Sequence, residues 1–210
     1  INMKFLNKNK VLCIGAHPDD VEYGMAGTFD KCKETNFTVV VMSGGGDFDD
    51  TTSDVDRKSE NEKVWDEFDN VDGHVYNSFV KGKDEDDMVN TIETNFKDYD
   101  LILTTPQEDS HFEHRMINNL GPALCRRNPT SLIEYRTPST LNHWIPNHFV
   151  ALSKYNLENK KKALSKFTSQ QHAPYFSEEC INSFHHNFLC SKKGMGIVES
   201  YRIVESYNII

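Results

Sequence analysis

Short apolar runs alternate along the chain with stretches in which apolar residues recur at helical spacing. The runs "KVLCIGAH", "FTVVVMS" and "YDLILTTP" have the length and continuous apolar character of buried strands, and "HVYNSFV" is a further candidate strand. Helical patterns separate these runs, over residues 21–35, 55–69, 86–97 and 113–126. This alternation predicts a parallel sheet with helices on both faces.

The second half of the chain is less regular. A short strand, "SLIEY", precedes a loop with two prolines that leads into another strand, "HFVALS". The remaining pattern indicates two helices and a closing strand, over residues 156–170, 175–190 and 196–204. With right-handed crossovers the fold class is α/β, Rossmann-like, with a mostly parallel sheet and an irregular C-terminal part over the site. No linker divides residues 1–210, so we expect a single domain.

Composition limits the class of protein. The 210 residues are 37% hydrophobic and 26% charged, which suits one soluble domain. No apolar stretch approaches the ~20 residues that cross a bilayer, and the first residues show no apolar core of a secretory signal. The five cysteines form no CxxC pair, which argues against a disulfide framework or a cysteine zinc site. We therefore expect a cytoplasmic protein, while its oligomeric state stays open.

The net charge of −9 is unevenly distributed. Residues 1–100 hold 23 acidic against 11 basic side chains, a balance of −12, and residues 101–210 hold 9 against 12, a balance of +3. The one basic cluster, "NKKKALSK", indicates the exposed face of a helix. A duplex-binding protein needs a basic stripe, so we expect no nucleic-acid partner.

The first apolar run ends in "AHPDD", residues 16–20, and two interpretations compete there. Pro18 disfavours helical geometry at His17, so His17 lies extended at the end of the strand. Pro18, Asp19 and Asp20 also suit the start of a helix, where negative charge is favoured. Adjacent carboxylates repel each other unless a cation or a proton is shared between them. The segment is therefore either an ordinary helix start or half of a metal site.

A second polar cluster follows the strand near residue 100. The run "LILTT" leads into "PQEDSHFEH", residues 106–114. In a Rossmann-type order these two strands flank the point where strand order reverses, and sites gather at their carboxyl ends. Two imidazoles, a carboxylate and an open position are typical of catalytic zinc, and a spare carboxylate can accept a proton from water. The alternative for this cluster is a polar loop with surface histidines.

The segment "AHPDDVEYGMAGT" resembles the AHPDD-x-E-x-G-x-x-GT signature of the PIG-L/LmbE-like family of zinc-dependent N-acetylglucosaminyl deacetylases. "EDSHFEHR" resembles the family's second motif, a His-x-Asp-His segment, and "RKSEN" resembles its Arg-x-x-Glu helix. "LIEYRTPST", "IPNHFVALS" and "KKKALSKFTSQ" resemble the C-terminal half of family members. The resemblance spans most of the chain.

Position by position, the resemblance implies a set of site residues. The implied metal ligands are His17, Asp20 and His114. It also implies Asp19 as the general base, His111 as the group that stabilises the oxyanion and assists the leaving group, and Arg57 as a substrate-binding residue. At position 113 the family usually has Asp, whereas this sequence has Glu. Glu113 carries the same charge on a longer side chain.

Other polar features receive plainer interpretations. "SGGGD", residues 43–47, predicts a flexible rim loop, because the Lys and Ser of a phosphate-binding loop do not follow it. Ser43 lacks the first glycine of a nucleophile elbow, which argues against a serine hydrolase. Five further histidines are expected at the surface or in the core: His143, His148, His172, His185 and His186.

The sequence therefore predicts a zinc-dependent deacetylase, a hydrolase of a non-peptide carbon–nitrogen bond. Its expected substrate is a small N-acetylglucosamine-type sugar or glycoconjugate, whose remaining part no motif identifies. Iron(II) is an alternative occupant of the same ligands, and a non-heme iron oxygenase would use the same triad. A catalytically silent sugar-binding module of the same fold is the other alternative, although such a module has no need of Asp19. Whether Asp19 or His111 protonates the leaving amine stays open.

Overall fold

The computed structural model describes residues 10–44, 54–76, 85–127, 130–185 and 196–205. Three features of the sequence lie outside these residues: most of "SGGGD", the second half of "HVYNSFV", and His186.

The first half of the chain alternates strand and helix without exception, as the hydrophobic pattern predicts. Its elements are β1 (Lys10–Gly15), α1 (Asp20–Lys31), β2 (Asn36–Val41), α2 (Asp54–Trp65), β3 (Val71–Val75), α3 (Glu85–Asn95), β4 (Leu101–Thr104), α4 (Phe112–Arg127) and β5 (Ser131–Tyr135). The second half comprises β6 (His148–Ala151), α5 (Lys154–Leu164), the 3-10 turns η1 (Thr168–Gln170) and η2 (Pro174–Phe176), α6 (Glu178–His185) and β7 (Val198–Glu205).

The largest differences from the predicted ranges concern the last helices. The helix expected over 156–170 begins at Lys154, because Ser153 and Asn156 form a capping box there, and it ends at Leu164. The pattern expected over 175–190 begins instead as the turn η2, with Pro174 at its first position, and α6 starts only at Glu178. Apolar spacing alone could not separate these short turns from the helices beside them.

The seven strands of the described residues form one sheet in the order β3-β2-β1-β4-β5-β7-β6. The five strands from β3 to β5 are parallel, and β7 runs antiparallel to both β5 and β6. The predicted Rossmann-like, mostly parallel α/β fold is therefore confirmed. The order reverses between β1 and β4, which places the expected crevice at the carboxyl ends of those two strands.

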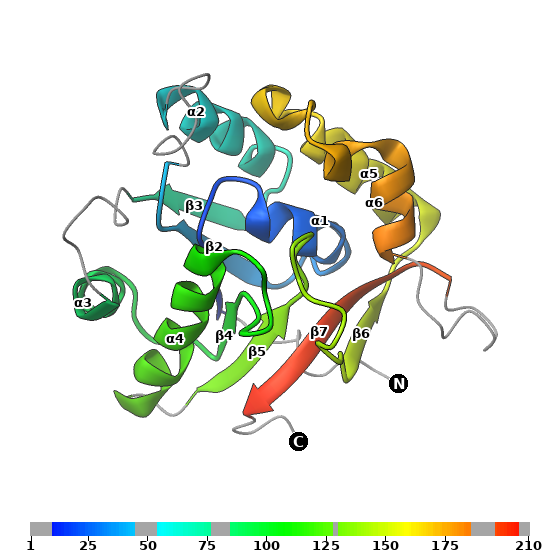
Figure 1. Cartoon of the computed structure of the whole chain (residues 1–210). Helices are drawn as coiled ribbons and strands as arrows, with labels where there is room; N and C mark the ends of the chain where they lie inside the picture. Colours follow the sequence, from blue (N-terminus) through cyan, green and yellow to red (C-terminus); the bar gives the residue numbers. More distant parts are fainter. Residues whose placement is uncertain (1–9, 45–53, 77–84, 128–129, 186–195, 206–210) are drawn as a thin grey trace.

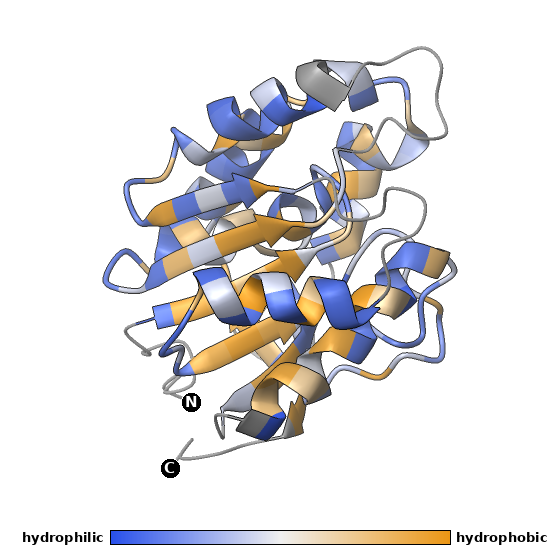
Figure 2. Cartoon of the chain, turned by 90° about the vertical axis from the view of Figure 1, so that its left-hand side faces the viewer, coloured by the Kyte–Doolittle hydropathy of each residue, from blue (hydrophilic) through white to orange (hydrophobic). Residues whose placement is uncertain are grey.

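Helices cover both faces of the sheet. Figure 1 shows α3 and α4 on one side and α1, α2, α5 and α6 on the other. Alternate residues of β1 serve two apolar cores accordingly, since Leu12 and Ile14 pack toward α4 while Val11 and Cys13 pack toward α1. Figure 2 shows the resulting pattern, with hydrophobic central strands and helices that are hydrophilic where they face outward.

Helix α1 lies unusually close to the sheet because of two glycines. A Cβ on Gly24 would lie 2.6 Å from Cδ2 of Tyr135, and one on Gly27 would lie 2.4 Å from Cδ1 of Leu152. Glycine in a helix costs about 1 kcal/mol relative to alanine, so close packing is the reason for its presence here. The close approach fixes the N-terminus of α1, and with it residues 17–20, relative to the sheet.

A buried ion pair lies beside the same helix, and its carboxylate ties α1 to β7, the strand between β5 and β6. Nζ of Lys160 on α5 donates to Oε1 of Glu199 on β7 at 2.6 Å, and both side chains are fully buried. The Glu199 carboxylate also accepts the backbone N–H groups of Gly27 and Thr28, at 2.9 and 2.7 Å. One carboxylate therefore joins α1, α5 and β7.

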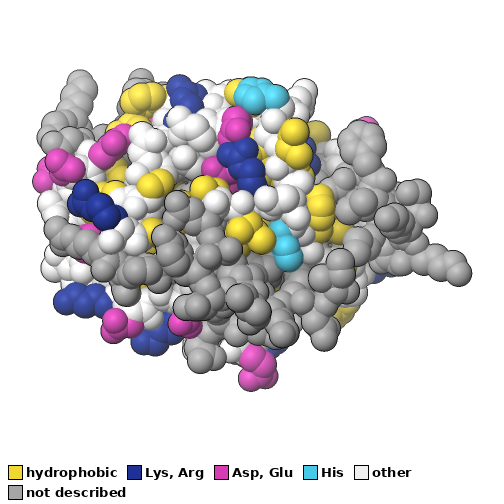
Figure 3. All heavy atoms as spheres, turned by 90° about the horizontal axis from the view of Figure 1, so that it is seen from below, with side chains coloured by type: hydrophobic (Ala, Val, Ile, Leu, Met, Phe, Trp, Pro, Cys, Tyr) yellow, Lys and Arg dark blue, Asp and Glu magenta, His cyan; other side chains and the backbone are white. Residues whose placement is uncertain are grey.

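One face of the molecule carries side chains of mixed character (Figure 3). Figure 3 shows one face, on which Lys and Arg side chains are interspersed with acidic, polar and apolar ones rather than gathered into a stripe. In the part of the chain that the structure describes, no helix combines the length and apolarity that a membrane crossing requires.

We predict that Glu199→Gln destabilises the protein strongly. The substitution keeps the size of the side chain but leaves the buried Lys160 charge without its anion, which typically costs about 3–5 kcal/mol in the free energy of unfolding. Urea denaturation measures the change. The control is Lys162→Ala, which removes an exposed partner of Glu67 and should cost no more than about 1 kcal/mol. Equal effects of the two substitutions would contradict the structural role of Glu199.

Candidate metal centre

The parallel pairing of β1 with β4 brings the two polar motifs together. Val11 lies opposite Leu101 and Cys13 opposite Leu103, so both strands reach the same edge of the sheet in register. The turn of residues 16–20 follows β1, and the loop that leads to α4 follows β4. The carboxyl ends of the two strands therefore carry "AHPDD" and "EDSHFEH" side by side.

Residues 17–20 do form a helix start, but their carboxylates do not cap the helix. Asp19 occupies the N-cap position of α1 with φ 104°, and its side chain makes no capping hydrogen bond. Such a φ is strained for a residue other than glycine and is characteristic of functional sites. Asp20 turns back instead, and its Oδ2 accepts the N–H groups of Ala16 and His17 at 3.0 and 2.8 Å. The two neighbouring aspartates are therefore held in different ways.

Three imidazoles and one carboxylate converge at this point. His17, His111 and His114 each offer a nitrogen within 4.8 Å of the other two. Asp20 lies among them, with Oδ1 at 3.1 Å from Nε2 of His114 and Oδ2 at 3.6 Å from Nδ1 of His17. Two sets of ligands thus share His17 and His114, and the third ligand is either Asp20 or His111.

In both rings that the two sets share, the outer nitrogen meets a carboxylate. Nε2 of His17 contacts Oε2 of Glu113, and Nδ1 of His114 lies 3.1 Å from Oδ2 of Asp109. Metal-binding histidines typically place a carboxylate on the nitrogen that does not bind the metal, which fixes the ring and raises its basicity. His17 and His114 follow this pattern. Their other ring nitrogens, Nδ1 of His17 and Nε2 of His114, face the Asp20 carboxylate. The longer arm of Glu113 thus still reaches a predicted ligand.

Asp109 is a site residue that the sequence motifs did not single out. Its side chain is nearly fully buried and accepts hydrogen bonds from Oγ1 of Thr137, at 2.5 Å, and from the backbone N–H of His111, at 2.8 Å. Its position inside "EDSHFEH" was the available signal. Spacing alone, however, does not show which nitrogen of His114 it meets.

The carboxylates of the cluster favour a positive charge beside them. Burial alone would lower the pKa of His17, but its hydrogen bonds to Asp20 and Glu113 raise it to about 9. Burial likewise opposes the charged form of His114, yet Asp20 and Asp109 raise its pKa to about 10. The same contacts outweigh burial at Asp20 and hold its pKa well below the ordinary value. A divalent cation between these groups supplies the same positive charge as the protonated imidazoles.

His111 differs from the other two histidines. Its side chain is 46% exposed, and its Nδ1 accepts the backbone N–H of Glu113 at 3.3 Å. That hydrogen bond assigns the ring hydrogen of the neutral imidazole to Nε2. Burial and the neighbouring imidazoles lower the pKa of His111, which favours the neutral form. His111 therefore offers an N–H donor at the rim of the cluster.

Asp19 lies beside the cluster in a different environment. Its side chain is buried, and desolvation raises its pKa to about 7, against the opposing charge of Arg57. Its Oδ2 lies 3.7 Å from Arg57 Nη2 and 3.4 Å from the hydroxyl of Tyr175. A carboxylate with a pKa near neutrality suits general acid–base chemistry.

Arg57, predicted to bind substrate, lies at the same place but is largely buried. Its Nη2 donates to the backbone oxygen of Pro18 at 2.9 Å. The guanidinium therefore holds the turn that carries Asp19.

The described histidines for which surface or core positions are expected stand apart from the cluster. His143 and His172 are exposed, His148 is half-buried on β6, and His185 is buried, with Nδ1 against the carbonyl of Ile181. These positions agree with the surface or core locations expected for them.

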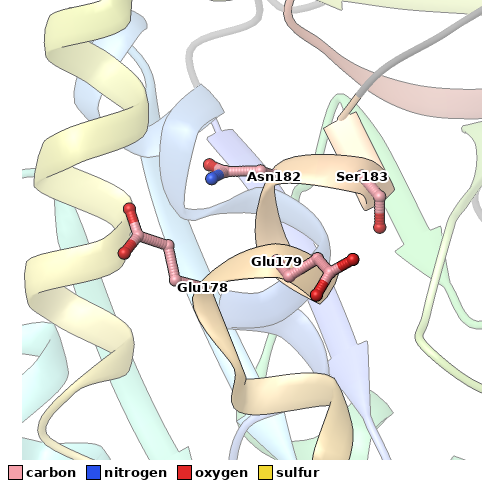
Figure 4. A pocket seen from close by; sticks show the side chains of 4 residues that line it. All are labelled: Glu178, Glu179, Asn182 and Ser183. Atoms are coloured by element: carbon pink, nitrogen blue, oxygen red, sulfur yellow. The ribbon is translucent and has the colours of Figure 1, made fainter.

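A shallow depression on α6 offers no comparable site. Glu178, Glu179, Asn182 and Ser183 line it, and Figure 4 shows their side chains pointing in different directions. The Glu178 carboxylate already pairs with Lys161 of α5 at 3.1 Å. Divergent carboxylates do not form a metal site.

Comparison with known proteins agrees with this geometry. The family model described as "PIG-L: GlcNAc-PI de-N-acetylase" matches residues 12–125, which include both polar motifs. A curated protein of Escherichia coli K12, named as the uncharacterized deacetylase YaiS, is 26% identical over 174 residues. That match covers 78% of this chain and 93% of the relative.

Solved structures share the fold. N,N'-diacetylchitobiose deacetylase from Pyrococcus horikoshii superposes with a TM-score of 0.68 at 21% identity, covering 97% of this chain and 86% of that one. GalB, the 4-carboxy-2-hydroxymuconate hydratase from Pseudomonas putida KT2440, superposes with a TM-score of 0.73 at 12% identity, covering 95% and 97%. A deacetylase and a hydratase are both similar to this chain in fold, so the fold alone does not define the reaction.

We predict that Asp109→Asn weakens metal binding about 10- to 100-fold, because the amide supports the His114 ring less well than the carboxylate. Titration of the metal-free protein with zinc, followed by calorimetry, measures the change. Ser110→Ala is the matched control, since the exposed Ser110 hydroxyl donates to the Ser139 carbonyl and its loss should leave the affinity unchanged. Unaltered zinc affinity in Asp109→Asn would refute the assignment.

Proposed function

The chain belongs to the PIG-L family of GlcNAc-PI de-N-acetylases, and on this premise we propose that it is a metal-dependent hydrolase that removes the acetyl group from an N-acetylglucosamine-type sugar or conjugate. One observation carries the proposal. A metal-ligand cluster and a separate buried carboxylate, Asp19, meet at the switch point of the sheet. Because every described strand belongs to one sheet, we propose that the whole chain acts as a single domain.

The donor set fits a divalent metal. We assign His17, Asp20 and His114 as its ligands, since the first and third have carboxylates behind them and Asp20 supplies the charge between them. Two imidazoles and one carboxylate are typical of catalytic zinc, and iron(II) accepts the same ligands. A bound metal of this kind supplies a positive charge that polarises an acetamide carbonyl and acidifies water.

Asp19 is assigned as the general base. It is anionic in part near neutral pH, it is buried, and it adjoins the ligand Asp20 without sharing its hydrogen bonds. From this position the carboxylate accepts the proton of the attacking water. A protein that only binds a sugar gains nothing from a strained, buried carboxylate here, which favours hydrolysis over a silent binding module.

His111 is assigned to the developing oxyanion. Its neutral ring carries the hydrogen on Nε2, so it can donate to a negatively charged oxygen beside the cluster. Donors of this kind stabilise such transition states by about 3–4 kcal/mol each. Hydrolysis ends with a proton on the departing amine, and Asp19 and His111 are the described groups beside the reacting atoms that can deliver it.

The substrate class follows from the relatives. The family model names a GlcNAc-bearing lipid, and the Pyrococcus structure names an N-acetylated chitobiose. An N-acetylated glucosamine unit is common to both. We therefore propose a small sugar or glycoconjugate that contains this unit.

We predict that replacing each of the two adjacent aspartates changes metal content and turnover in a different way. Asp19→Asn keeps all three ligands, so metal content should stay near wild type while turnover falls about 10²–10⁴-fold. Asp20→Asn removes the anionic ligand and should lose most of the metal. His111→Ala should keep the metal and slow acetate release. Metal analysis and acetate release, measured on the same purified proteins with N-acetylglucosamine oligomers, distinguish these results.

The reverse pattern would show that the roles of the aspartates are exchanged. Loss of metal from His111→Ala together with its retention in Asp20→Asn would replace Asp20 by His111 in the ligand set. Full metal content and full activity in all three variants would reduce "AHPDD" to a helix start.

We predict that Arg57→Ala raises KM about tenfold with the metal retained, if the guanidinium contacts substrate hydroxyls as the resemblance implies. Steady-state kinetics separate this role from the structural one. A fall in kcat at unchanged KM would instead assign Arg57 to holding the Pro18 carbonyl and Asp19.

A further inference from the structure

The turn η2, in the second half of the chain, places a tyrosine beside Asp19, the candidate base. The hydroxyl of Tyr175 donates to Oδ2 of Asp19 at 3.4 Å, across 156 residues of sequence. We infer that Tyr175 is a positioning residue that fixes the orientation of the Asp19 carboxylate toward the reacting water. The inference rests on the proposed function, in which Asp19 is the general base.

Asp19 needs support from outside its own helix. Its backbone is strained, and its side chain makes no capping bond to α1. The two donors beside it, Tyr175 and Arg57, both approach Oδ2. Among the described residues none donates a hydrogen bond to Oδ1. The carboxylate is therefore held by one oxygen and leaves the other for water.

Tyr175 is itself held by the helix that Asp19 begins. The hydroxyl of Tyr23 on α1 donates to the backbone oxygen of Tyr175 at 2.6 Å. The two rings meet edge to face at 5.7 Å, and the ring of Phe176 packs on Tyr23 at 5.9 Å. These contacts fix the place of Tyr175 along α1.

Helix α2 holds the segment that leads to Tyr175. Glu60 is buried and accepts three hydrogen bonds from η1, from Oγ1 of Thr168 at 2.5 Å and from the N–H and hydroxyl of Ser169 at 2.8 and 2.7 Å. Arg57 lies one turn earlier on α2 and holds the Pro18 carbonyl. The same helix therefore sets both the turn with Asp19 and the segment with Tyr175.

The length of the contact determines the size of the expected effect. An O–H···O bond is usually 2.7–2.8 Å, so the 3.4 Å contact of Tyr175 is a weak one. Its removal should lower kcat about tenfold, far less than removal of the base itself. Because Tyr175 reaches the base through its hydroxyl, substrate affinity and metal content should not change.

Tyr175→Phe tests the inference, because it keeps the ring contacts with Tyr23 and removes only the hydroxyl. Tyr155→Phe is the control, since Tyr155 is 71% exposed on α5. We expect Tyr175→Phe to lower kcat about tenfold, with KM, zinc content and thermal stability within error of wild type. Tyr155→Phe should match wild type in all four measurements.

Three outcomes of these measurements would overturn the inference. They are an unchanged kcat, a change confined to KM, and a loss of zinc or thermal stability that accounts for the loss of rate. A crystal structure of Tyr175→Phe gives a readout that needs no activity. The Asp19 carboxylate should take one orientation in the wild-type protein and a rotated or divided one in the variant. Identical carboxylates would reject the role of Tyr175, whereas a wild-type enzyme that releases no acetate would reject only the proposed function.

Discussion

The parallel pairing of β1 with β4 is the constraint on which the site depends. Residues of the cluster follow both strands, with His17 and Asp20 after β1 and His111 and His114 after β4, so neither strand end carries the whole cluster. The helices that follow diverge, since α1 packs on one face of the sheet and α4 on the other (Figure 1). Open α/β sheets bind ligands at the carboxyl ends of the strands where the strand order reverses, as it does between β1 and β4. A shift of this register by one residue would change how the two parts of the cluster face each other.

Two neighbouring aspartates acquire opposite properties, because polar contacts outweigh burial at Asp20 whereas burial prevails at Asp19. Asp20 receives two backbone N–H groups and faces imidazoles, so its pKa lies well below the ordinary value. Asp19 makes no capping bond with its own helix, and burial raises its pKa to about 7. Groups whose environments separate their pKa values in this way take different chemical roles. The two carboxyl groups of "AHPDD" thus differ: contacts favour the anionic form of Asp20, and the pKa of Asp19 lies near neutrality.

The sequence predicted those parts of the molecule that local pattern determines. Continuous apolar runs identified the central strands, and the two motifs placed His17 and His114 at adjoining strand ends. The sequence did not predict the contacts of Asp109, Glu60 and Tyr175. Each contact joins residues that lie 5 to 156 positions apart, and it depends on side-chain directions that sequence spacing does not determine. Arg57 shows the same limit: its motif implied contact with substrate, whereas its bond to Pro18 depends on how α2 packs.

The central proposal is that His17, Asp20 and His114 hold the metal, with Glu113 and Asp109 behind the two rings. Anomalous diffraction at the zinc absorption edge, from crystals of the zinc-loaded protein, tests it most directly. We expect one peak at about 2.0–2.3 Å from Nδ1 of His17, the Asp20 carboxylate and Nε2 of His114. A peak bound by His111 in place of Asp20, or a cluster that takes up no zinc, would contradict it.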